Sequence, residues 1–339
     1  MKFRFAAATA VVALALATPL QANDSTAETR AGGLVLVQNR DIDMREEDLF
    51  VSADQIRVRY VFRNTAAQDR TVTVAFPLPD RDLADEQHGN VGYPSDFRTT
   101  VDGRPMELQV QRRAFVRGTD HTALLNRLRV PISPEVVNDR NTAVAALDAL
   151  PRAEQDRLVR LGVAAVEEYD AGQGMERHLA PAWTIRESWT RQQTFPAGRD
   201  VVVEHRYTPG AGGSVGTVLS IPNMRSDPDY ARTVRDYCVD QAFLSGVQRL
   251  AREGGEASGG IVPERRVGYI LTTGGNWRSP IGRFRLVVDK GDARNLVSFC
   301  GEGVRRISPT QFEMVRTNWR PDRDLRVLIV GPADALFRE

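Results

Sequence analysis

"QIRVRYVFR", residues 55–63, is the stretch of sequence that decides the fold. Its even positions, from Ile56 to Phe62, are apolar, and three arginines and a valine alternate with them. A side-chain period of two predicts a β-strand with one face in the core and the other in water. A polar turn at 64–70 and a second apolar run at 71–76 follow, which predicts an antiparallel partner strand.

The neighbouring residues extend this pattern into a larger sheet. Pro77 and Pro79 end the second strand, because proline has no N–H to donate to a sheet ladder. Asp102-Gly103 is typical of the turn of a further hairpin. We therefore expect antiparallel β-structure over 34–115, arranged as a β-sandwich.

Helical periodicity interrupts the β pattern twice. Between 119 and 180, apolar residues recur at helical spacing among prolines, which predicts a helical insertion within the β domain. Asp227-Pro228 is typical of a helix start, and an apolar stripe continues to Glu253, which predicts one long amphipathic helix. Further strands are expected at 183–195, 201–207, 267–272, 284–289, 296–299, 312–317 and 325–330.

Together these elements predict a mainly β, β-sandwich-like fold that is α+β overall. We expect a β-sandwich-like domain over 23–222, which holds the helical insertion at 119–180. A helix and a β-rich C-terminal region are expected to follow over 223–339.

The first 22 residues have a different character from the rest of the chain. Lys2 and Arg4 precede an apolar run over 5–17, which is too short for a membrane span. This pattern is typical of a cleaved signal peptide, with cleavage after Ala22 and a mature chain that begins at Asn23. It predicts a periplasmic protein, and no other apolar run approaches the ~18 residues that a membrane span needs.

The composition is that of a globular protein, with 42% hydrophobic and 26% charged residues. The formal net charge of +1 favours neither nucleic acid nor an anionic membrane as a partner. Cys238 and Cys300 are the only cysteines and permit one pairing, which an oxidising compartment favours. Such a disulfide closes a loop of ~60 residues and stabilises by roughly 4 kcal/mol on the chain-entropy model. Two separate buried thiols are the alternative.

The sequence motifs that suggest catalysis each lack a required part. Gly212–Gly216 has the letters of a hydrolase nucleophile elbow, but neither a helix pattern nor a histidine follows it. We therefore interpret it as a Gly-rich loop. The four histidines lack the spacing of a zinc site. Cys300–Gly303 contains a GxG without the third glycine of a dinucleotide-binding loop.

Four acids in the loop after Pro79 form the one candidate metal site. They are Asp80, Asp82, Asp85 and Glu86. Carboxylate oxygens suit calcium, which is available to an exported protein, whereas a solvated acidic loop explains the same residues without any metal. Apart from calcium, no cofactor is expected.

Two tryptophans and an acid form the candidate ligand platform. Trp183, Glu187 and Trp189 have the same parity on a predicted strand. Aromatic rings on one face can stack on a sugar or a peptide, although tryptophan more often fills core space. Trp277 and Trp319 lie beside turns containing glycine or proline and are expected to be partly exposed.

Several stretches together resemble an uncharacterised family of exported bacterial proteins, known as a domain of unknown function. The stretches are Asn23–Glu28, Gly32–Leu34, Asp41–Phe62, Phe76–Pro79, Gln193–Gly198, Val203–Tyr207, Asn276–Gly291 and Ser298–Gly303. The resemblance covers nearly the whole mature chain and implies export, but it implies no activity, substrate or catalytic residue. Residues 55–103 are also similar to the vault-protein/inter-alpha-trypsin type of β domain, a resemblance that implies an interaction module rather than an enzyme.

Three functions are compatible with these observations. We expect a non-catalytic periplasmic protein that binds a partner protein or a cell-envelope component. The alternative is an envelope hydrolase or carbohydrate-active enzyme that uses carboxylates, with Glu187 and Trp189 near its site. A third hypothesis is calcium-dependent adhesion through residues 80–86.

Overall fold

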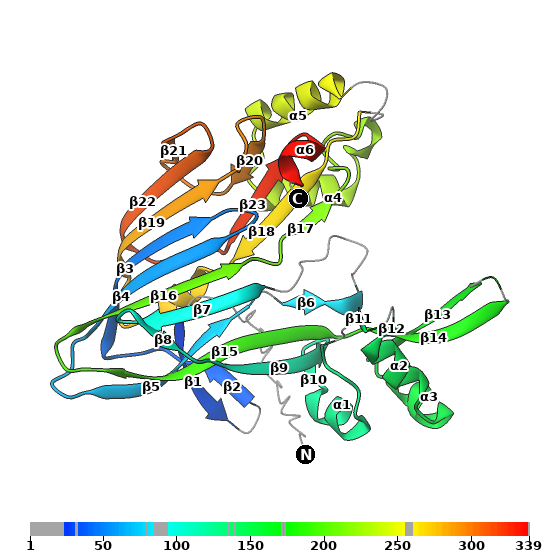
Figure 1. The fold of residues 1–339 in the computed structure, drawn as a ribbon, viewed down its shortest axis with the longest axis horizontal. Coiled ribbons are helices and arrows are strands. Elements are labelled where there is room, and N and C mark those ends of the chain that lie inside the picture. The colour runs from blue at the N-terminus through cyan, green and yellow to red at the C-terminus, as the bar shows by residue number, and fades with distance from the viewer. Residues whose placement is uncertain are drawn as a thin grey trace, which may run out of the picture.

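In the computed structural model, an eight-stranded sheet forms the centre of the fold (Figure 1). The structure describes residues 24–30, 33–78, 80–84, 94–133, 136–137, 140–170, 172, 174–254 and 260–337, so the predicted leader lies outside it. In spatial order the strands are β21 (Arg305–Arg306), β22 (Gln311–Trp319), β19 (Ile281–Asp289), β3 (Ile42–Val51), β4 (Ile56–Asn64), β16 (Asp200–Thr208), β7 (Ser95–Val101) and β8 (Arg104–Met106). The stretch that predicts the fold is therefore β4, whose even positions are buried.

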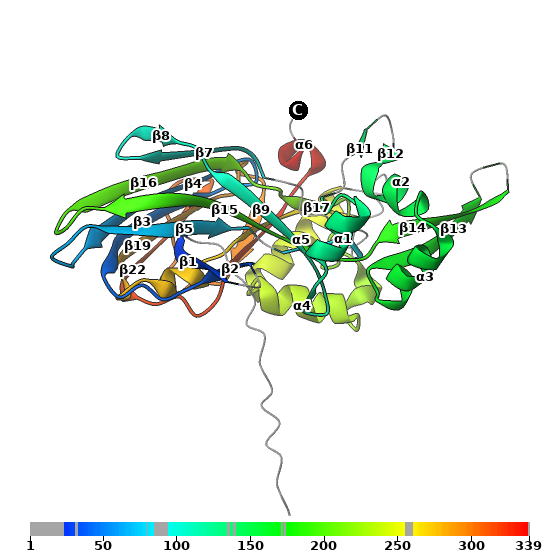
Figure 2. The same ribbon diagram turned by 90° about the horizontal axis from the view of Figure 1, so that it is seen from below.

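A seven-stranded antiparallel sheet packs against one face of the central sheet (Figure 2). Its strands, in order, are β10 (Thr119–Asp120), β9 (Gln109–Val116), β15 (Thr184–Phe195), β5 (Arg70–Pro77), β1 (Ser25–Arg30) and β2 (Gly33–Leu36), with β6 (Arg81–Asp82) also paired to β15. The two sheets together form the predicted β-sandwich.

A four-stranded sheet and two helices complete the C-terminal part. The strands are β17 (Gly212–Ser214), β18 (Glu264–Tyr269), β23 (Leu325–Val330) and β20 (Leu296–Phe299). The helices α4 (Pro228–Asp236) and α5 (Gln241–Glu253) cover one face of this sheet, and a short helix, α6 (Ala333–Leu336), follows β23. Single 3-10 turns lie at Pro222–Met224 and Thr272–Asn276.

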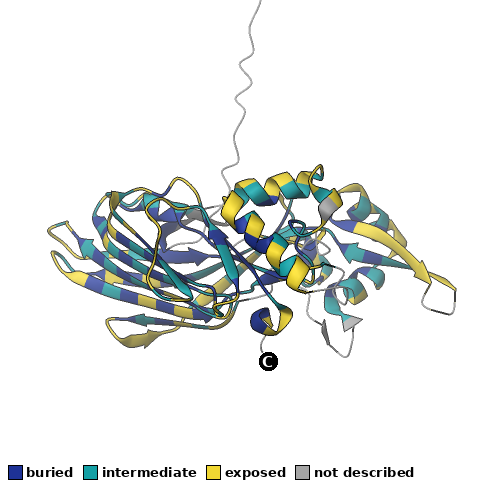
Figure 3. Cartoon of the chain, turned by 90° about the horizontal axis from the view of Figure 1, so that it is seen from above, coloured by how far each residue is buried: buried dark blue, intermediate teal, exposed yellow. Residues whose placement is uncertain are grey.

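The predicted helical insertion is a separate lobe at one end of the molecule. It contains α1 (Thr122–Leu128), α2 (Thr142–Asp148), α3 (Arg152–Arg160) and the hairpins β11 (Val136–Val137) to β12 (Arg140–Asn141) and β13 (Ala164–Asp170) to β14 (Met175–Pro181). The lobe has its own apolar core around Leu147 and Trp183. Figure 3 shows that its projecting hairpin is largely exposed, whereas the sheet interiors are buried.

One hydrophobic core joins the three large sheets. It includes Phe62 from the central sheet, Phe76 and Phe195 from the seven-stranded sheet, and Tyr269 and Val327 from the four-stranded sheet. Residues from both predicted regions therefore contribute to the same core. β19 also pairs in parallel with β3, so the two regions share a sheet as well.

The predicted long helix is two helices with a break at 237–240. Asp227 caps α4 as its sequence suggests, and Pro228 is the first helical residue. Cys238 then adopts a left-handed backbone conformation with φ of 51°. Asp240 accepts a hydrogen bond from the Phe243 N–H and begins α5. The apolar stripe continues through both helices, so periodicity alone does not reveal the break.

Candidate ligand-binding pocket

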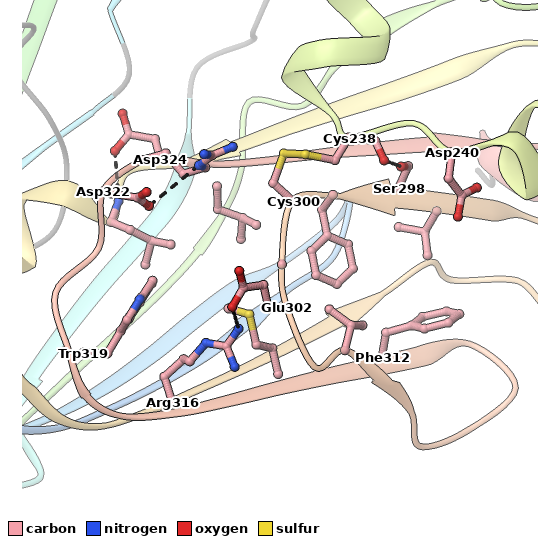
Figure 4. Close-up of a pocket in the computed structure, with 18 of the residues that line it drawn as sticks. Cys238, Asp240, Ser298, Cys300, Glu302, Phe312, Arg316, Trp319, Asp322 and Asp324 are labelled. Carbon is pink, nitrogen blue, oxygen red and sulfur yellow. Dashed lines mark hydrogen bonds and ion pairs between the residues drawn. A yellow bond between two sulfur atoms is a disulfide. The ribbon is translucent and has the colours of Figure 1, made fainter.

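A pocket of about 810 Å³ lies between β22 of the eight-stranded sheet and β20 of the four-stranded sheet (Figure 4). Strands β20 and β22 line it, together with the start of β23 and of α5. Its size is within the ordinary range of small-molecule sites. We therefore treat this pocket as a candidate ligand-binding site.

The disulfide predicted from the sequence lies on the rim of this pocket. Cys238 and Cys300 are bonded, which joins the break between α4 and α5 to the loop after β20. Gly301 follows, and a Cβ there would lie 3.0 Å from both the Met314 sulfur and Val304 Cγ2, so a larger residue would require these side chains to shift. The loop is thus fixed at Cys300 and closely packed at its next residue.

The floor of the pocket is apolar and partly aromatic. Leu271, Met314 and Leu325 are buried, whereas Phe299 and Trp319 are only partly covered. Trp319 packs on Phe284 with ring centroids 4.6 Å apart, which holds its ring in place. The partly exposed position predicted for Trp319 is confirmed.

Charged side chains surround this floor, and their interactions differ. Asp324 accepts hydrogen bonds from the Leu271 and Thr272 N–H groups and from the Thr272 hydroxyl. Asp240 is occupied as the cap of α5. Arg316 donates to Glu302 across the pocket at 3.1 Å. Two of the acids therefore hold the backbone, and Glu302 is the one that pairs with Arg316.

A second polar group, the buried charge cluster, lies in the main core and consists of Asp24, Arg191, His205 and Thr99. Arg191 Nη2 lies 2.7 Å from Asp24 Oδ2, and His205 Nε2 lies 3.1 Å from Asp24 Oδ1. The Thr99 hydroxyl lies 2.8 Å from His205 Nδ1. The ionisable side chains are at most 1% exposed. The cluster ties the first described residue to β15 and β16, so it supports the fold rather than an open site.

The electrostatics of the buried charge cluster assign its protonation. Burial raises the pKa of Asp24, but Arg191 and His205 outweigh this effect and hold the pKa well below its usual range. Burial lowers the pKa of His205, in opposition to the attraction of Asp24. His205 is therefore neutral near pH 7, and its hydrogen bonds assign the proton to Nε2, which donates to Asp24.

The candidate ligand platform is divided between two parts of the structure. Trp183 is fully buried in the core of the insertion lobe, where its indole N–H donates to the Ile132 carbonyl. Trp189 packs against the main core and donates to Glu187 Oε1 at 2.6 Å. Arg112 donates to the other Glu187 oxygen at 2.6 Å. Both oxygens of this buried carboxylate are thus engaged, and a role in binding or catalysis stays a prediction.

The candidate calcium residues are only partly described. Asp85 and Glu86 lie outside the described residues. Asp80 pairs with Arg186 at 3.0 Å, and burial raises the pKa of Asp80 although Arg186 opposes the shift. Asp82 accepts a hydrogen bond from the Ala84 N–H. Within the described ranges no three metal-binding side chains come together, and calcium binding stays a prediction.

The structure also describes Trp277 and the Gly-rich stretch at 212–216. Trp277 is fully buried, so the expectation that it is partly exposed is wrong; its indole N–H donates to the Asp24 carbonyl at 2.7 Å. The expected Gly-rich loop at 212–216 begins as the edge strand β17, and the Ser214 hydroxyl donates to the Gly216 carbonyl. Among the described helices, none combines the length and apolar character that crossing a bilayer requires.

The pocket is not evident from the sequence, because its sides come from distant segments. The stretch that comes closest to indicating a site is Cys300–Gly303, in which an acid between two glycines follows a cysteine. Nothing in that stretch indicates that it faces Arg316. That neighbour follows from the β21–β22 hairpin, which brings the chain back past Glu302.

Comparison with known proteins identifies a family but no activity. A family model described as a domain of unknown function (DUF4424) matches residues 22–328. No curated protein matches the chain. A Legionella pneumophila structure described as a "putative nutrient binding protein" is 15% identical over 91% of this chain and 70% of its own, with a TM-score of 0.45. An M1 zinc metallopeptidase from Deinococcus radiodurans is 11% identical over 88% of this chain and 44% of its own, with a TM-score of 0.21. Likenesses at these scores carry no functional information.

Proposed function

This chain belongs to the DUF4424 family, a domain of unknown function, and we propose that it is an exported, non-catalytic binding protein of the periplasm. Its ligand, a partner protein or a cell-envelope component, occupies the pocket between β20, β22 and β23. The observation that carries the proposal is the pocket itself, which combines an apolar floor with charged groups on its rim. Binding sites commonly have this composition.

Export is supported by the leader pattern that ends at Ala22. The Cys238–Cys300 disulfide supports it as well, because disulfides persist in oxidising compartments. The expected product in a periplasmic extract is a chain that begins at Asn23. Intact mass measurement of the extracted protein tests this, and a protein that retains residues 1–22 in the cytoplasm would contradict export.

Site-specific photo-crosslinking in living cells tests the binding role. Val304 lines the pocket and is 37% exposed, so p-benzoylphenylalanine placed there reaches whatever occupies it. Val110, on β9 of the other sheet, has a similar exposed fraction of 40% and serves as the matched control position. The adducts are separated under denaturing conditions and their masses determined.

We expect one defined adduct from position 304 and none from position 110. Equal adducts at both positions would indicate non-specific contact. The absence of any adduct at 304 in cells that contain the protein at its natural level would contradict the proposal.

A further inference from the structure

We infer that the pocket recognises a carboxylate attached to an apolar group, and that Arg316 binds this carboxylate in place of Glu302. The inference rests on the proposed function and adds the chemical class of the ligand. The C-terminus of a partner protein and a small acid derived from the cell envelope both present this chemistry.

Arg316 is one of four arginines that line the pocket, and it is the one that already holds a carboxylate over the apolar floor. Arg306 and Arg320 donate to backbone carbonyls, and Arg323 lies 3.7 Å from Asp322. Arg316 projects from β22 into the pocket, with 26% of its side chain exposed (Figure 4). Within the described residues its ion-pair partner is Glu302, which accepts a hydrogen bond from Nη2. A guanidinium carries five N–H donors in a planar fork that matches the two oxygens of a carboxylate. Arg316 therefore retains donors for a second, better placed acid.

Glu302 is a weak partner that a ligand can replace. Its side chain is 95% exposed, so water competes for the ion pair and its net contribution is small. Gly301 and Gly303 flank it, and Gly303 has a φ of 64° that glycine tolerates best. The backbone on both sides of Glu302 therefore carries no side chain that would hold it over the pocket.

The other acids on the rim do not neutralise Arg316. Asp324 and Asp240 are engaged by backbone N–H groups, as described above. Asp322 lies 3.7 Å from Arg323, and both side chains are largely exposed. In this structure the carboxylate of Glu302 occupies the position beside Arg316. A ligand carboxylate can occupy the same position.

The surface next to Arg316 indicates that the rest of the ligand is apolar. Met314 precedes it by two positions on the same strand, so both side chains lie on the same face. Trp319 and Phe299 add partly exposed aromatic area to that floor. A carboxylate bound by Arg316 would therefore place its apolar substituent against Met314 and the aromatic rings.

Calorimetric titration of the mature chain with paired probes tests the inference. The probes are N-acetyl-phenylalanine and N-acetyl-alanyl-alanyl-phenylalanine, each as the free acid and as the C-terminal amide. We expect each acid that fits to bind at least 10-fold more tightly than its amide, because the amide loses the charge-assisted pair with Arg316. Preference for the tripeptide acid identifies a peptide C-terminus, and preference for the single residue identifies a small acid.

Three variants connect this preference to the pocket. Arg316→Gln is expected to reduce the affinity for the acid at least 10-fold. Glu302→Gln is expected to raise it about 3-fold, because the competing carboxylate is gone. Arg59→Gln is the matched control, since Arg59 on β4 also pairs with an exposed glutamate, Glu46 on β3, and neither residue lines the pocket.

The outcomes separate this inference from the proposed function. Equal binding of acid and amide, unchanged binding in Arg316→Gln, or no binding of any probe at millimolar concentration overturns the carboxylate inference. In each of these cases the crosslink from position 304 still decides the proposed function. Glu302→Gln changes an exposed residue that should not affect folding, so weaker or unchanged acid binding in this variant also overturns the inference, even if Arg316→Gln fails to fold.

Discussion

Replacing Asp24 by asparagine should destabilise the protein far more than a typical change to a surface ion pair. Asp24 and Arg191 are 0% and 1% exposed, and their closest oxygen and nitrogen are 2.7 Å apart. The asparagine side chain is nearly the same size but has no charge, so the buried guanidinium loses its counter-ion. Removal of one partner of a buried ion pair costs about 3–5 kcal/mol.

This free energy translates into a measurable change in melting temperature. Unfolding entropy is roughly 2.1 cal/mol/K per residue, which gives about 0.7 kcal/mol/K for the ~317 residues after the predicted cleavage site. A loss of about 3–5 kcal/mol therefore lowers the melting temperature by about 4–7 °C. Thermal unfolding followed by far-UV circular dichroism at pH 7 measures it, and urea unfolding gives the free energy directly.

Two comparisons identify the cause of this loss. Asp200→Asn breaks the exposed pair with Arg63 and should change the unfolding free energy by less than about 1 kcal/mol. In the double variant Asp24→Asn/Arg191→Met no charge is left without a partner, so its loss should be smaller than the sum of the single losses by about 1 kcal/mol or more. A loss below about 1 kcal/mol for Asp24→Asn, or strict additivity in the double variant, would refute the reasoning.

Four further predictions address other sites. His205 has a lowered pKa in the folded state, so at a pH below ~6.5 the unfolded chain binds a proton that the folded chain does not. The unfolding free energy should therefore fall from pH 7 to pH 5, and it should fall less steeply in His205→Gln. The Cys238→Ser/Cys300→Ser variant should lose up to about 4 kcal/mol in urea unfolding, and reductant should produce the same loss only in the wild type. Glu187→Gln should cost about 1–2 kcal/mol, because the glutamine NH2 group only donates and cannot replace the carboxylate oxygen that accepts from Arg112 or from Trp189; full turnover of this variant on peptidoglycan, if the wild type shows turnover, would exclude Glu187 as a catalytic acid. Millimolar calcium should raise the melting temperature if the acidic loop binds the ion, and an unchanged melting curve would exclude this site.

Local patterns in the sequence predicted the elements that depend on near neighbours. The alternation at 55–63 predicted β4, because a strand with one buried face needs a period of two. Asp227 and Pro228 predicted the start of α4, since the cap and the first turn are built from adjacent residues. The Cys238–Cys300 bond was predictable because only one pairing exists.

The features that depend on distant residues were not predictable in this way. A turn sequence containing glycine and asparagine precedes Trp277 and suggests exposure, yet the ring packs in the main core against Phe62, and the distant Asp24 carbonyl accepts its N–H. The pocket is the same kind of case. Glu302 and Arg316 become neighbours through the β21–β22 hairpin, whereas Leu271 comes from the segment after β18 and Leu325 from the start of β23. Contacts of this kind leave no periodic pattern in a single amino-acid sequence.

The parallel pairing of β3 with β19 has a consequence for the order in which the protein folds. Arg283 pairs with Glu46, which lies 237 positions earlier in the chain. A chain synthesised from its N-terminus exposes one edge of β3 until most of the remaining residues have appeared. Unpaired strand edges promote aggregation, and contacts between distant residues form slowly. The central sheet is therefore completed late, and the unfinished protein should depend on a chaperone that shields this edge.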